Sequence, residues 1–185
     1  MAEEIKIRFH GRGGQGVVTA SRLVAEAALK QGKKVQSFPS FGAERKGAPI
    51  KAFTKISNEP ILNRSQIYNP DIVIVLDPTL LKVENVTEGL VKDGTIIVNI
   101  DKNPDQIKSE LKLNNKVATI NATKIALETL GTAITNTPIL GALAKVTGIV
   151  SLEAIIEVTK ERFKQGLAEK NINAIKRAYE EVKMS

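Results

Sequence analysis

The sequence predicts an α/β fold, a Rossmann-like three-layer α/β/α domain with a mainly parallel sheet and C-terminal helices. Two observations support this prediction. Short apolar segments typical of strands alternate with longer segments of helical periodicity, which is the pattern of α/β domains. The first strand also leads through a glycine-rich loop directly into a helix, as in sheets that bind phosphate groups. A chain of 185 residues fits one domain, so residues 1–185 are expected to form a single unit.

The first strand is expected over residues 5–9 and the first helix over 17–30, a run without Gly or Pro. The loop between them can turn sharply and approach an anion, because glycine has no Cβ and the first N–H groups of the helix have no intrahelical partner. The pattern Gly11-x-Gly13-x-x-Gly16 also matches the dinucleotide-binding fingerprint. The candidate binding residues of this loop are Gly11, Arg12, Gly13, Gly14, Gln15 and Gly16.

The fingerprint lacks the acidic residue that usually accompanies it. A nicotinamide or flavin site expects Asp or Glu about 20 residues further on, at the end of the second strand, to hold the ribose hydroxyls. The second strand is expected over 34–38, and no carboxylate stands at its end. This argues against NAD. Two interpretations remain: a site for another anion or for a partner, which Arg12 favours, and a tight turn without a ligand.

An unusual segment, residues 39–49, follows the second strand. Two prolines enclose two glycines and the charged triplet Glu44, Arg45 and Lys46. The segment is expected to cross the carboxyl end of the strand, where open α/β sheets bind ligands. The alternative is an ordinary mobile connection, but the Pro and Gly residues favour a defined shape. The triplet therefore joins the candidate site.

The remaining elements follow from apolar runs, their length and the turn residues between them. Residues 50–56 alternate in strand fashion and are expected to add an antiparallel strand or hairpin. Residues 71–77 form a continuous apolar run between two Asp residues, which is typical of a central parallel strand. Further elements are expected, in order, as a helix at about 79–90, a strand at 95–100, a short helix at 103–113, a strand at 116–121 and a helix at 123–130.

The last third of the chain is expected to form three helices. Pro138 stands in the first turn of one, with Asn136 or Thr137 as its cap. Ser151 is the expected cap of the next, and the apolar residues within 172–182 lie on one face of the last. For the turn around Pro138, core packing and a contact surface are equally supported.

Composition excludes several kinds of site. The chain has no cysteine, so it cannot hold a disulfide, a thiolate zinc site or a cysteine-ligated iron–sulfur cluster. Its one histidine, His10, is expected to be structural, so no metal site and no catalytic triad are expected. No apolar run is long enough to span a membrane and the N-terminus does not resemble a signal peptide, so a cytoplasmic location is expected.

The formal charge of +7 permits attraction to nucleic acid or to a phosphorylated ligand. However, aromatic residues make up only 4% of the chain, Trp is absent, and the basic residues are dispersed. Proteins that bind single strands use aromatic side chains in a continuous basic groove. Nucleic acid is therefore not expected as a partner.

Three segments together resemble the gamma subunit of 2-oxoacid:ferredoxin oxidoreductases, with pyruvate:ferredoxin oxidoreductase (pyruvate synthase) as the nearest type. They are Gly-Arg-Gly-Gly-Gln-Gly at 11–16, Ser-Phe-Gly-Ala-Glu-Arg-Lys-Gly-Ala-Pro at 40–49 and Asn-Thr-Pro-Ile-Leu-Gly at 136–141. The glycine loop alone is common, but the second segment is long and unusual, and all three occur in the family's order. The resemblance covers residues 5–142, and it implies a single gamma-type domain of the pyruvate/ketoisovalerate oxidoreductases.

The resemblance implies an activity that the chain does not perform alone. The complex would decarboxylate a 2-oxoacid oxidatively with coenzyme A, giving acyl-CoA, carbon dioxide and reduced ferredoxin. Thiamine diphosphate and [4Fe–4S] clusters would lie on the partner alpha, beta and delta subunits, which agrees with the absence of Cys and of an obvious thiamine signature here. This chain would hold no cofactor and no catalytic residue, and would contribute to the coenzyme A site and to subunit contacts.

Carried onto this chain, the resemblance places the loop Gly11–Gly16 with Arg12 against coenzyme A or a partner, and Glu44, Arg45 and Lys46 near the same cleft. Lys46 stands where many relatives have arginine, so a two-point grip on phosphate is not expected from it. The alternative function is a free-standing nucleotide-binding regulatory protein that uses the same loop, and the missing acid after the second strand argues against it. The sequence does not distinguish pyruvate from 2-oxoisovalerate, 2-oxoglutarate or indolepyruvate as the substrate.

Overall fold

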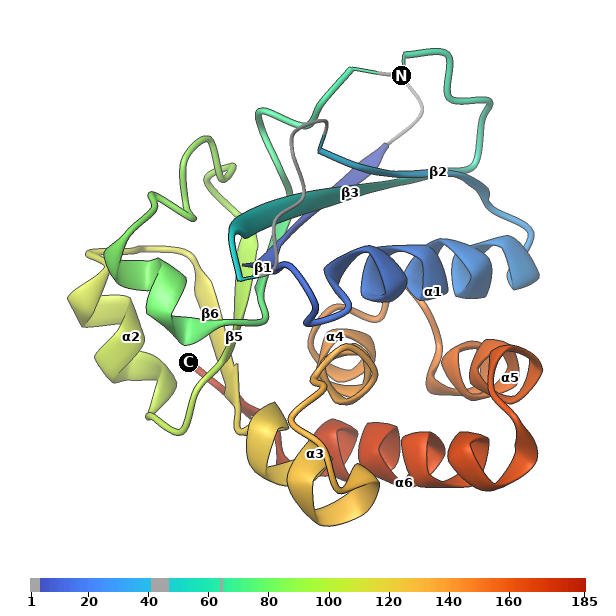
Figure 1. The fold of residues 1–185 in the computed structure, drawn as a ribbon. Coiled ribbons are helices and arrows are strands. Elements are labelled where there is room, and N and C mark those ends of the chain that lie inside the picture. Colours follow the sequence, from blue (N-terminus) through green and yellow to red (C-terminus); the bar gives the residue numbers. More distant parts are fainter. Residues whose placement is uncertain (1–3, 41–46, 64) are drawn as a thin grey trace.

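The computed structural model describes residues 4–40, 47–63 and 65–185. In this part of the chain a seven-stranded sheet, in the order β2-β3-β1-β4-β5-β6-β7, is packed between helices (Figure 1). The strands are β1 (Ile5–Arg12), β2 (Lys34–Pro39), β3 (Pro49–Ser57), β4 (Ile72–Val75), β5 (Thr95–Asn99), β6 (Lys116–Ile120) and β7 (Lys183–Met184). The helices are α1 (Val17–Lys30), the 3₁₀ helix η1 (Pro78–Lys82), α2 (Pro104–Glu110), α3 (Ala122–Leu130), α4 (Pro138–Thr147), α5 (Leu152–Arg162) and α6 (Gln165–Glu181).

Most strands of the described sheet point in one direction. β1, β4, β5 and β6 pair in parallel, and β3 runs antiparallel to β1. Because β2 is in turn antiparallel to β3, it points the same way as β1, and β7 is antiparallel to β6. The predicted mainly parallel sheet is confirmed, and the antiparallel strand expected at 50–56 is β3.

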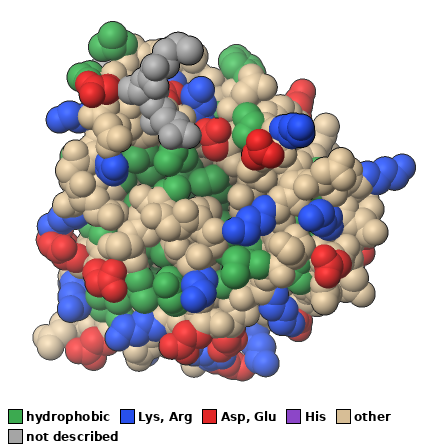
Figure 2. All heavy atoms as spheres, turned by 180° about the vertical axis from the view of Figure 1, so that it is seen from behind, with side chains coloured by type: hydrophobic (Ala, Val, Ile, Leu, Met, Phe, Trp, Pro, Cys, Tyr) green, Lys and Arg blue, Asp and Glu red, His purple; other side chains and the backbone are tan. Residues whose placement is uncertain are grey.

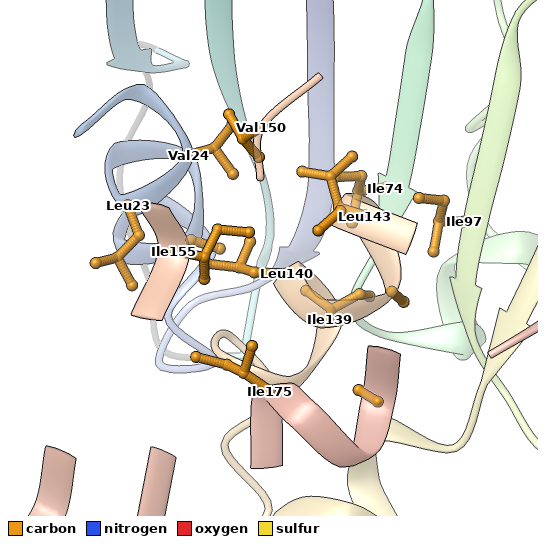
Figure 3. Close-up of a cluster of buried hydrophobic side chains, with 14 of the residues drawn as sticks. Leu23, Val24, Ile74, Ile97, Ile139, Leu140, Leu143, Val150, Ile155 and Ile175 are labelled. Carbon is orange, nitrogen blue, oxygen red and sulfur yellow. The ribbon is translucent and has the colours of Figure 1, made fainter. Parts of the chain in front are cut away.

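One face of the sheet is covered by α1 and the C-terminal helices. The core there is built from aliphatic side chains of the sheet, such as Ile74 and Ile97, and of the five helices α1 and α3–α6, and Figure 3 shows part of it. Leu140 and Leu143 of α4 are fully buried between the sheet and α6. The helical periodicity of the last third therefore follows from packing on the sheet and on each other, as predicted.

The opposite face has a thinner cover, made of η1, α2 and the segments between elements. Its apolar cluster is smaller and centres on β4 and β5, with Leu80 of η1 and Ile107 of α2 packed against them. Because β4 and β5 are buried on both faces, their sequences are continuous apolar runs, which confirms the prediction of central strands.

The structure differs from the predicted elements at three places. β1 extends to Arg12, because its last residues pair with β3 in the register Arg12↔Pro49. The helix expected at about 79–90 is wrong: η1 ends at Lys82 and turns follow, because the carbonyls of Val86 and Glu88 accept hydrogen bonds from Arg8 instead of from a helix. The short strand β7 was not expected.

The turn around Pro138 lies inside the fold, so core packing rather than surface contact explains it. Thr135, Asn136 and Thr137 are buried, and the Thr137 hydroxyl donates a hydrogen bond to Asn171 of α6. Further along α4, a Cβ on Gly141 would lie 2.0 Å from the carbonyl oxygen of Ile175. Glycine at this position lets α4 and α6 touch backbone to backbone.

Candidate functional site

The three segments that carry the family resemblance meet at the carboxyl ends of β1 and β4. The Gly13 amide donates to the Ala48 carbonyl at 2.9 Å, and the Gly47 amide donates to the Gly13 carbonyl at 3.2 Å. These bonds join the glycine loop to the described end of the 39–49 segment. A Cβ on Gly16 would lie 2.6 Å from Asn136 Nδ2, so the third segment abuts the same loop. Residues far apart in the sequence thus form one site.

This site lies at the point where the chain connections of the sheet diverge. From β1 the chain leads through α1 to β2 at one edge, whereas from β4 it leads to β5 on the other side. Ligands of open α/β sheets bind in the crevice at such a switch point, outside the carboxyl ends of the strands. The position therefore agrees with the predicted location of a binding site.

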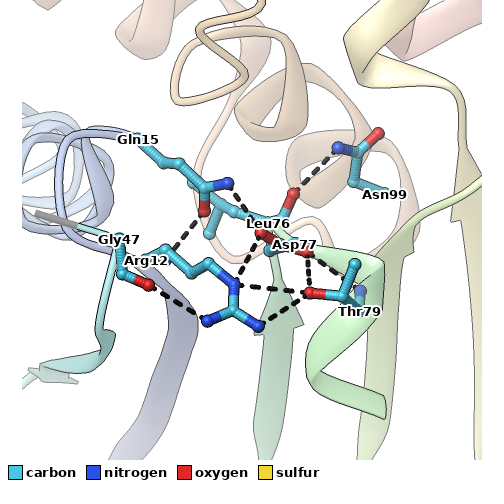
Figure 4. Close-up of polar contacts among 7 residues, drawn as sticks. All are labelled: Arg12, Gln15, Gly47, Leu76, Asp77, Thr79 and Asn99. Atoms are coloured by element: carbon cyan, nitrogen blue, oxygen red, sulfur yellow. Dashed lines mark hydrogen bonds and ion pairs between the residues drawn. The ribbon is translucent and has the colours of Figure 1, made fainter. Parts of the chain in front are cut away.

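A network of charged and polar side chains holds the glycine loop against the end of β4 (Figure 4). Asp77 accepts hydrogen bonds from Gln15 Nε2 at 2.8 Å and from the Thr79 hydroxyl at 2.6 Å, and its Oδ2 lies 3.2 Å from Arg12 Nε. The Gln15 Oε1 accepts from the Arg12 amide at 2.8 Å, and the Arg12 guanidinium donates to the Gly47 carbonyl at 3.0 Å. The network fixes the shape of the loop from both sides.

Asp77 is a fixed carboxylate rather than a proton carrier. Burial opposes its ionisation, but the hydrogen bonds from Thr79 and Gln15 and the charge of Arg12 outweigh burial and lower the pKa of Asp77 below its usual value. A carboxylate with such a pKa stays ionised near neutral pH, and both of its oxygens are engaged. It therefore serves to position Arg12 and Gln15 and does not suit general base catalysis.

The N-terminus of α1 presents donors at the surface of this site. Gly16 is the N-cap residue in the left-handed conformation, with φ 79°, and no side chain caps the helix. Within residues 4–40, 47–63 and 65–185, the amides of Gly14, Gly16, Val17 and Val18 have no hydrogen-bond acceptor. The first turn of α1 also contains no acidic residue. Free N–H groups and the positive end of the helix dipole favour an anion here.

Two glycines of the loop are required by close contacts. A Cβ on Gly11 would lie 2.4 Å from Val17 Cγ2, because the first turn of α1 packs directly on β1. Gly16 has both a positive φ and the close contact with Asn136. Gly14, with φ 94°, makes the exposed turn between them.

The order of the strands explains why the dinucleotide fingerprint lacks its acid. In a dinucleotide-binding sheet the second strand lies beside the first and ends next to the loop. Here β3 lies beside β1 and runs antiparallel to it, so β3 begins, at Pro49, where the other strand would end. No strand end is available to place a carboxylate on a ribose.

His10, in β1, belongs to a buried row of hydrogen-bonded polar side chains. Arg8 Nε donates to His10 Nε2 at 3.0 Å, and His10 Nδ1 lies 3.4 Å from Glu84 Oε2. Burial, with the charges of Arg8 and Lys51, lowers the pKa of His10 from 6.5 to about 3. The ring is therefore neutral near pH 7 and donates from Nδ1 to Glu84, a hydrogen bond between a neutral ring and a carboxylate rather than an ion pair. This contact pattern supports the expected structural role.

The structure brings together the predicted residues from Gly11 to Gly16. Glu44, Arg45 and Lys46 lie outside the described residues. Sequence reasoning missed Asp77 and Thr79, and it named Asn136 as a helix cap and as the start of the third family segment but not as a candidate site residue. A signal was present for Asp77, because a polar residue directly after a buried parallel strand stands at the ligand-binding edge of the sheet. No sequence signal linked Asn136 to Gly16.

The back of the molecule, so far as its residues are described, shows no continuous surface of one charge. Seen from behind, the molecule carries Lys and Arg side chains mixed with Asp and Glu, and apolar side chains gather near the middle of that face (Figure 2). Mixed charge there favours a solvated surface over a nucleic-acid groove. In the described part of the chain, no group of three or more His, Asp or Glu side chains is placed to hold a metal ion. No described helix is both long and apolar enough to cross a membrane.

Comparison with known proteins agrees with this geometry. The family model described as pyruvate ferredoxin/flavodoxin oxidoreductase matches residues 6–181. The chain is 53% identical to the pyruvate/ketoisovalerate oxidoreductases common subunit gamma of Pyrococcus furiosus, over 97% of this chain and 98% of that one. It is 51% identical to the pyruvate synthase subunit PorC of Methanothermobacter marburgensis, over 98% of this chain and 99% of that one.

The solved structures give the same result. The crystal structure of the pyruvate oxidoreductase subunit PORC of Thermotoga maritima superposes with a TM-score of 0.88 at 44% identity, covering 99% of each chain. The fold and the switch-point loop thus define a Rossmann-like subunit whose three sequence motifs build one edge. The chain belongs to the pyruvate ferredoxin/flavodoxin oxidoreductase family, as a gamma subunit of a 2-oxoacid:ferredoxin oxidoreductase. The alternative of a free-standing regulatory protein is not supported.

Proposed function

We propose that this chain forms part of the coenzyme A site of a pyruvate- or 2-oxoisovalerate-oxidising complex. The observation that carries the proposal is the convergence of the three family motifs around the uncapped N-terminus of α1. Coenzyme A carries a diphosphate and a 3′-phosphate, whereas a small oxoacid needs no such extended anion site. The amides of Gly14, Gly16, Val17 and Val18, which have no acceptor among the described residues, suit phosphate oxygens.

In this proposal the chain binds and orients but makes no bond to the substrate. Asp77 is engaged on both oxygens and His10 is buried beneath the sheet edge, so neither presents an acid or base to a ligand. Thiamine diphosphate would supply the decarboxylation chemistry and the iron–sulfur clusters the electron transfer. Both would reside on the alpha, beta and delta partners, since a chain without Cys has no thiolate for a cluster. Ferredoxin would meet the complex through those partners.

Arg45 is the residue whose substitution tests the proposal. A guanidinium can hold a phosphate through two N–H groups, and losing one charge-assisted contact of roughly 1.5–3 kcal/mol corresponds to about a tenfold loss of affinity or more. In the assembled enzyme, we expect Arg45→Ala to raise the KM for coenzyme A about tenfold and to leave the KM for the oxoacid unchanged.

The matched control is Arg22→Ala, which removes an exposed arginine from the side of α1. It should change neither KM. If Arg45→Ala leaves the coenzyme A KM untouched and instead weakens assembly of the subunits, the 39–49 segment is an interface element and the site assignment is wrong.

A further inference from the structure

The excess positive charge of the chain is concentrated in one part of it. Basic residues are dispersed along the whole sequence, but residues 6–55 contain eleven of them and only two acidic residues, whereas residues 56–185 contain sixteen of each. The first part includes β1, β2 and β3, which form one end of the sheet. These three strands carry six Lys or Arg side chains and no Asp or Glu.

The six basic side chains point to the same face of the sheet. The register places Lys6 opposite Lys55, and residues that pair directly across two strands point to one side. Residues two apart along a strand also share a side. The other side packs on α1, where the Thr54 hydroxyl donates to the Ser21 carbonyl. The basic set, on the side away from α1, is Lys6, Arg8, Arg12, Lys34, Lys51 and Lys55.

Two irregular segments cover this basic face. One leads from β3 to β4 and the other follows η1 (Figure 1). They touch each other, because the Asn69 side-chain amide donates to the Gly89 carbonyl at 3.4 Å. Neither contains a helix or a strand where the structure describes it, and for a connection as long as the first this is typical of binding loops. The cover is the name used below for residues 58–63, 65–70 and 83–89.

The sheet holds the cover by its backbone. Lys55 Nζ donates to the Asn63 carbonyl at 2.7 Å, and the Arg8 guanidinium donates to the Val86 and Glu88 carbonyls at 3.0 and 2.6 Å. Both basic side chains are buried, and among the described residues neither forms an ion pair. Because the bonds go to carbonyl oxygens, the side chains of the cover are left to face outward.

Acidic residues near the cover offset only part of the basic charge. Residues 58–90 contain five acidic and two basic residues. Set against the six basic residues of the strands, they leave eight positive and five negative charges, an excess of three, on this side of the sheet. A surface with such an excess attracts a partner of opposite charge.

The cover also carries the most exposed large apolar side chains of the described residues. Leu62, Tyr68 and Val83 are 91%, 72% and 63% exposed, and Leu29 of α1 follows at 58%. Exposed apolar and aromatic side chains that gather on one surface, with polar and charged residues around them, mark a protein–protein interface. The basic charge and the apolar contact therefore coincide.

A pocket of about 400 Å³ in the cover joins the two kinds of residue, because Phe53 and the buried Arg8 both line it. Arg8 has five N–H groups and four acceptors among the described residues, so one N–H remains available. Lys51 also lines the pocket, and its Nζ lies 3.9 Å from Glu84 Oε2, too far for a hydrogen bond. Glu88 is the one acidic residue among the described lining, so the two cations outweigh it.

We propose that the cover is the docking surface for a partner subunit of the oxidoreductase that presents acidic residues around an apolar contact. The partner's apolar side chains pack on Leu62, Tyr68 and Val83, and one of its carboxylates enters the pocket toward Arg8 and Lys51. A second copy of this chain fits less well, because two copies would bring the same positive excess together. The surface lies on a face of the sheet, and the proposal does not depend on the coenzyme A site.

The apolar contact is tested with two exposed leucines in the assembled complex. Leu62→Ala changes the cover, and Leu127→Ala changes α3, where the side chain is 52% exposed. Mass photometry over a dilution series gives the Kd between this chain and its partner subunits. We expect Leu62→Ala and Tyr68→Ala each to raise the Kd about tenfold or more, and Leu127→Ala to change it less than about twofold.

The charge is tested with two lysines. Lys51 and Lys102 are 37% and 41% exposed, and each lies near one glutamate. Lys51→Gln should raise the Kd several-fold at low salt and less in about 0.5 M NaCl, because salt screens the attraction. Lys102→Gln should leave the Kd unchanged at both salt concentrations. Equal effects of the two substitutions would overturn the acidic partner.

Three further results would overturn the proposal. They are an equal loss of affinity in Leu62→Ala and Leu127→Ala, no loss in Leu62→Ala and Tyr68→Ala, and self-association of the wild-type chain that Leu62→Ala abolishes. If neither cover variant folds, as judged by thermal melting of the isolated chain, the side chains are structural and the proposal fails. At concentrations well above the Kd, both cover variants should keep the wild-type KM for coenzyme A, so this proposal and the coenzyme A site fail independently.

Discussion

The two faces of the sheet are stabilised in different ways. On the face of α1 and α4–α6, aliphatic side chains of strands and helices fill a continuous core, and the helices touch through residues such as Gly141 (Figures 1 and 3). On the other face, beside β1, the segment after η1 is held by hydrogen bonds to a buried guanidinium and forms no helix. Arg8 is 6% exposed and donates to the carbonyls of Val86 and Glu88 and to His10.

The difference teaches which parts of the fold periodicity can predict. Helices packed on a sheet need regular apolar stripes, so α1 and α3 were predicted nearly to their ends, and α4 and α5 were predicted at their first turns. On the second face the chain after Pro78 contains an apolar stretch that predicted a helix. Its carbonyls instead accept hydrogen bonds from Arg8, about 80 residues earlier, and no local pattern records such a contact.

The largest expected effect is on the helical face. In Gly141→Val the new Cβ would lie 2.0–3.0 Å from backbone atoms of Ile175 and Tyr179. These atoms belong to α6 and cannot easily move away. We expect a loss of about 3 kcal/mol or more in the free energy of unfolding, or no folded protein. Urea unfolding of the isolated chain measures it. Gly166→Ala in α6 is the control, since nothing lies within 4 Å of the added carbon, and it should not destabilise the chain.

The second-largest effect is expected on the opposite face of the sheet, where Arg8 is buried. Arg8→Met keeps the volume but leaves the Val86 and Glu88 carbonyls without their donor, at a cost of about 2–3 kcal/mol. The same urea measurement applies, with Lys6→Met on the same strand as a control that removes a cation with no described side-chain contact. Equal effects of the two substitutions would show that charge, and not the hydrogen bonds, matters on this face.

A pH series tests the same face. The pKa of His10 is lowered from 6.5 in the unfolded chain to about 3, so between these values the unfolded state binds more protons. The contribution of His10 is therefore complete above pH 6.5 and is lost as the pH falls toward 3. We expect wild type to lose about 2 kcal/mol more than His10→Gln between pH 7 and pH 5. Parallel stability curves for the two proteins would contradict the buried, neutral histidine.

The smallest effect is expected at the solvent edge of the site. Arg12 pairs with Asp77 at 3.2 Å, but its side chain is 29% exposed, so water screens the pair. Arg12→Ala should lower the free energy of unfolding by no more than about 1 kcal/mol. A larger loss in urea unfolding would mean that the loop network, and not the apolar core, holds β1 to β4.

The site itself was predicted in part. The glycine loop, its helix and its place at the carboxyl edge follow from local sequence, because a strand, a glycine-rich loop and a helix follow each other directly and Gly11 is needed for a contact with Val17, six residues away. Asp77 could be suspected from its place after a buried strand. Asn136 could not be linked to the loop, because its contact with Gly16 depends on how α4 packs on the sheet, and packing at that distance leaves no mark in the sequence.

Amide hydrogen exchange of the assembled enzyme, with and without coenzyme A, tests the central claim most directly. If the N-terminus of α1 binds coenzyme A, adding coenzyme A should slow exchange at the amides of Gly14, Gly16, Val17 and Val18, which have no acceptor in the described chain. Amides near the C-terminus of α1, around Lys30, should exchange at the same rate in both samples. Protection that is absent from Gly14–Val18 and confined to the partner subunits would contradict the account.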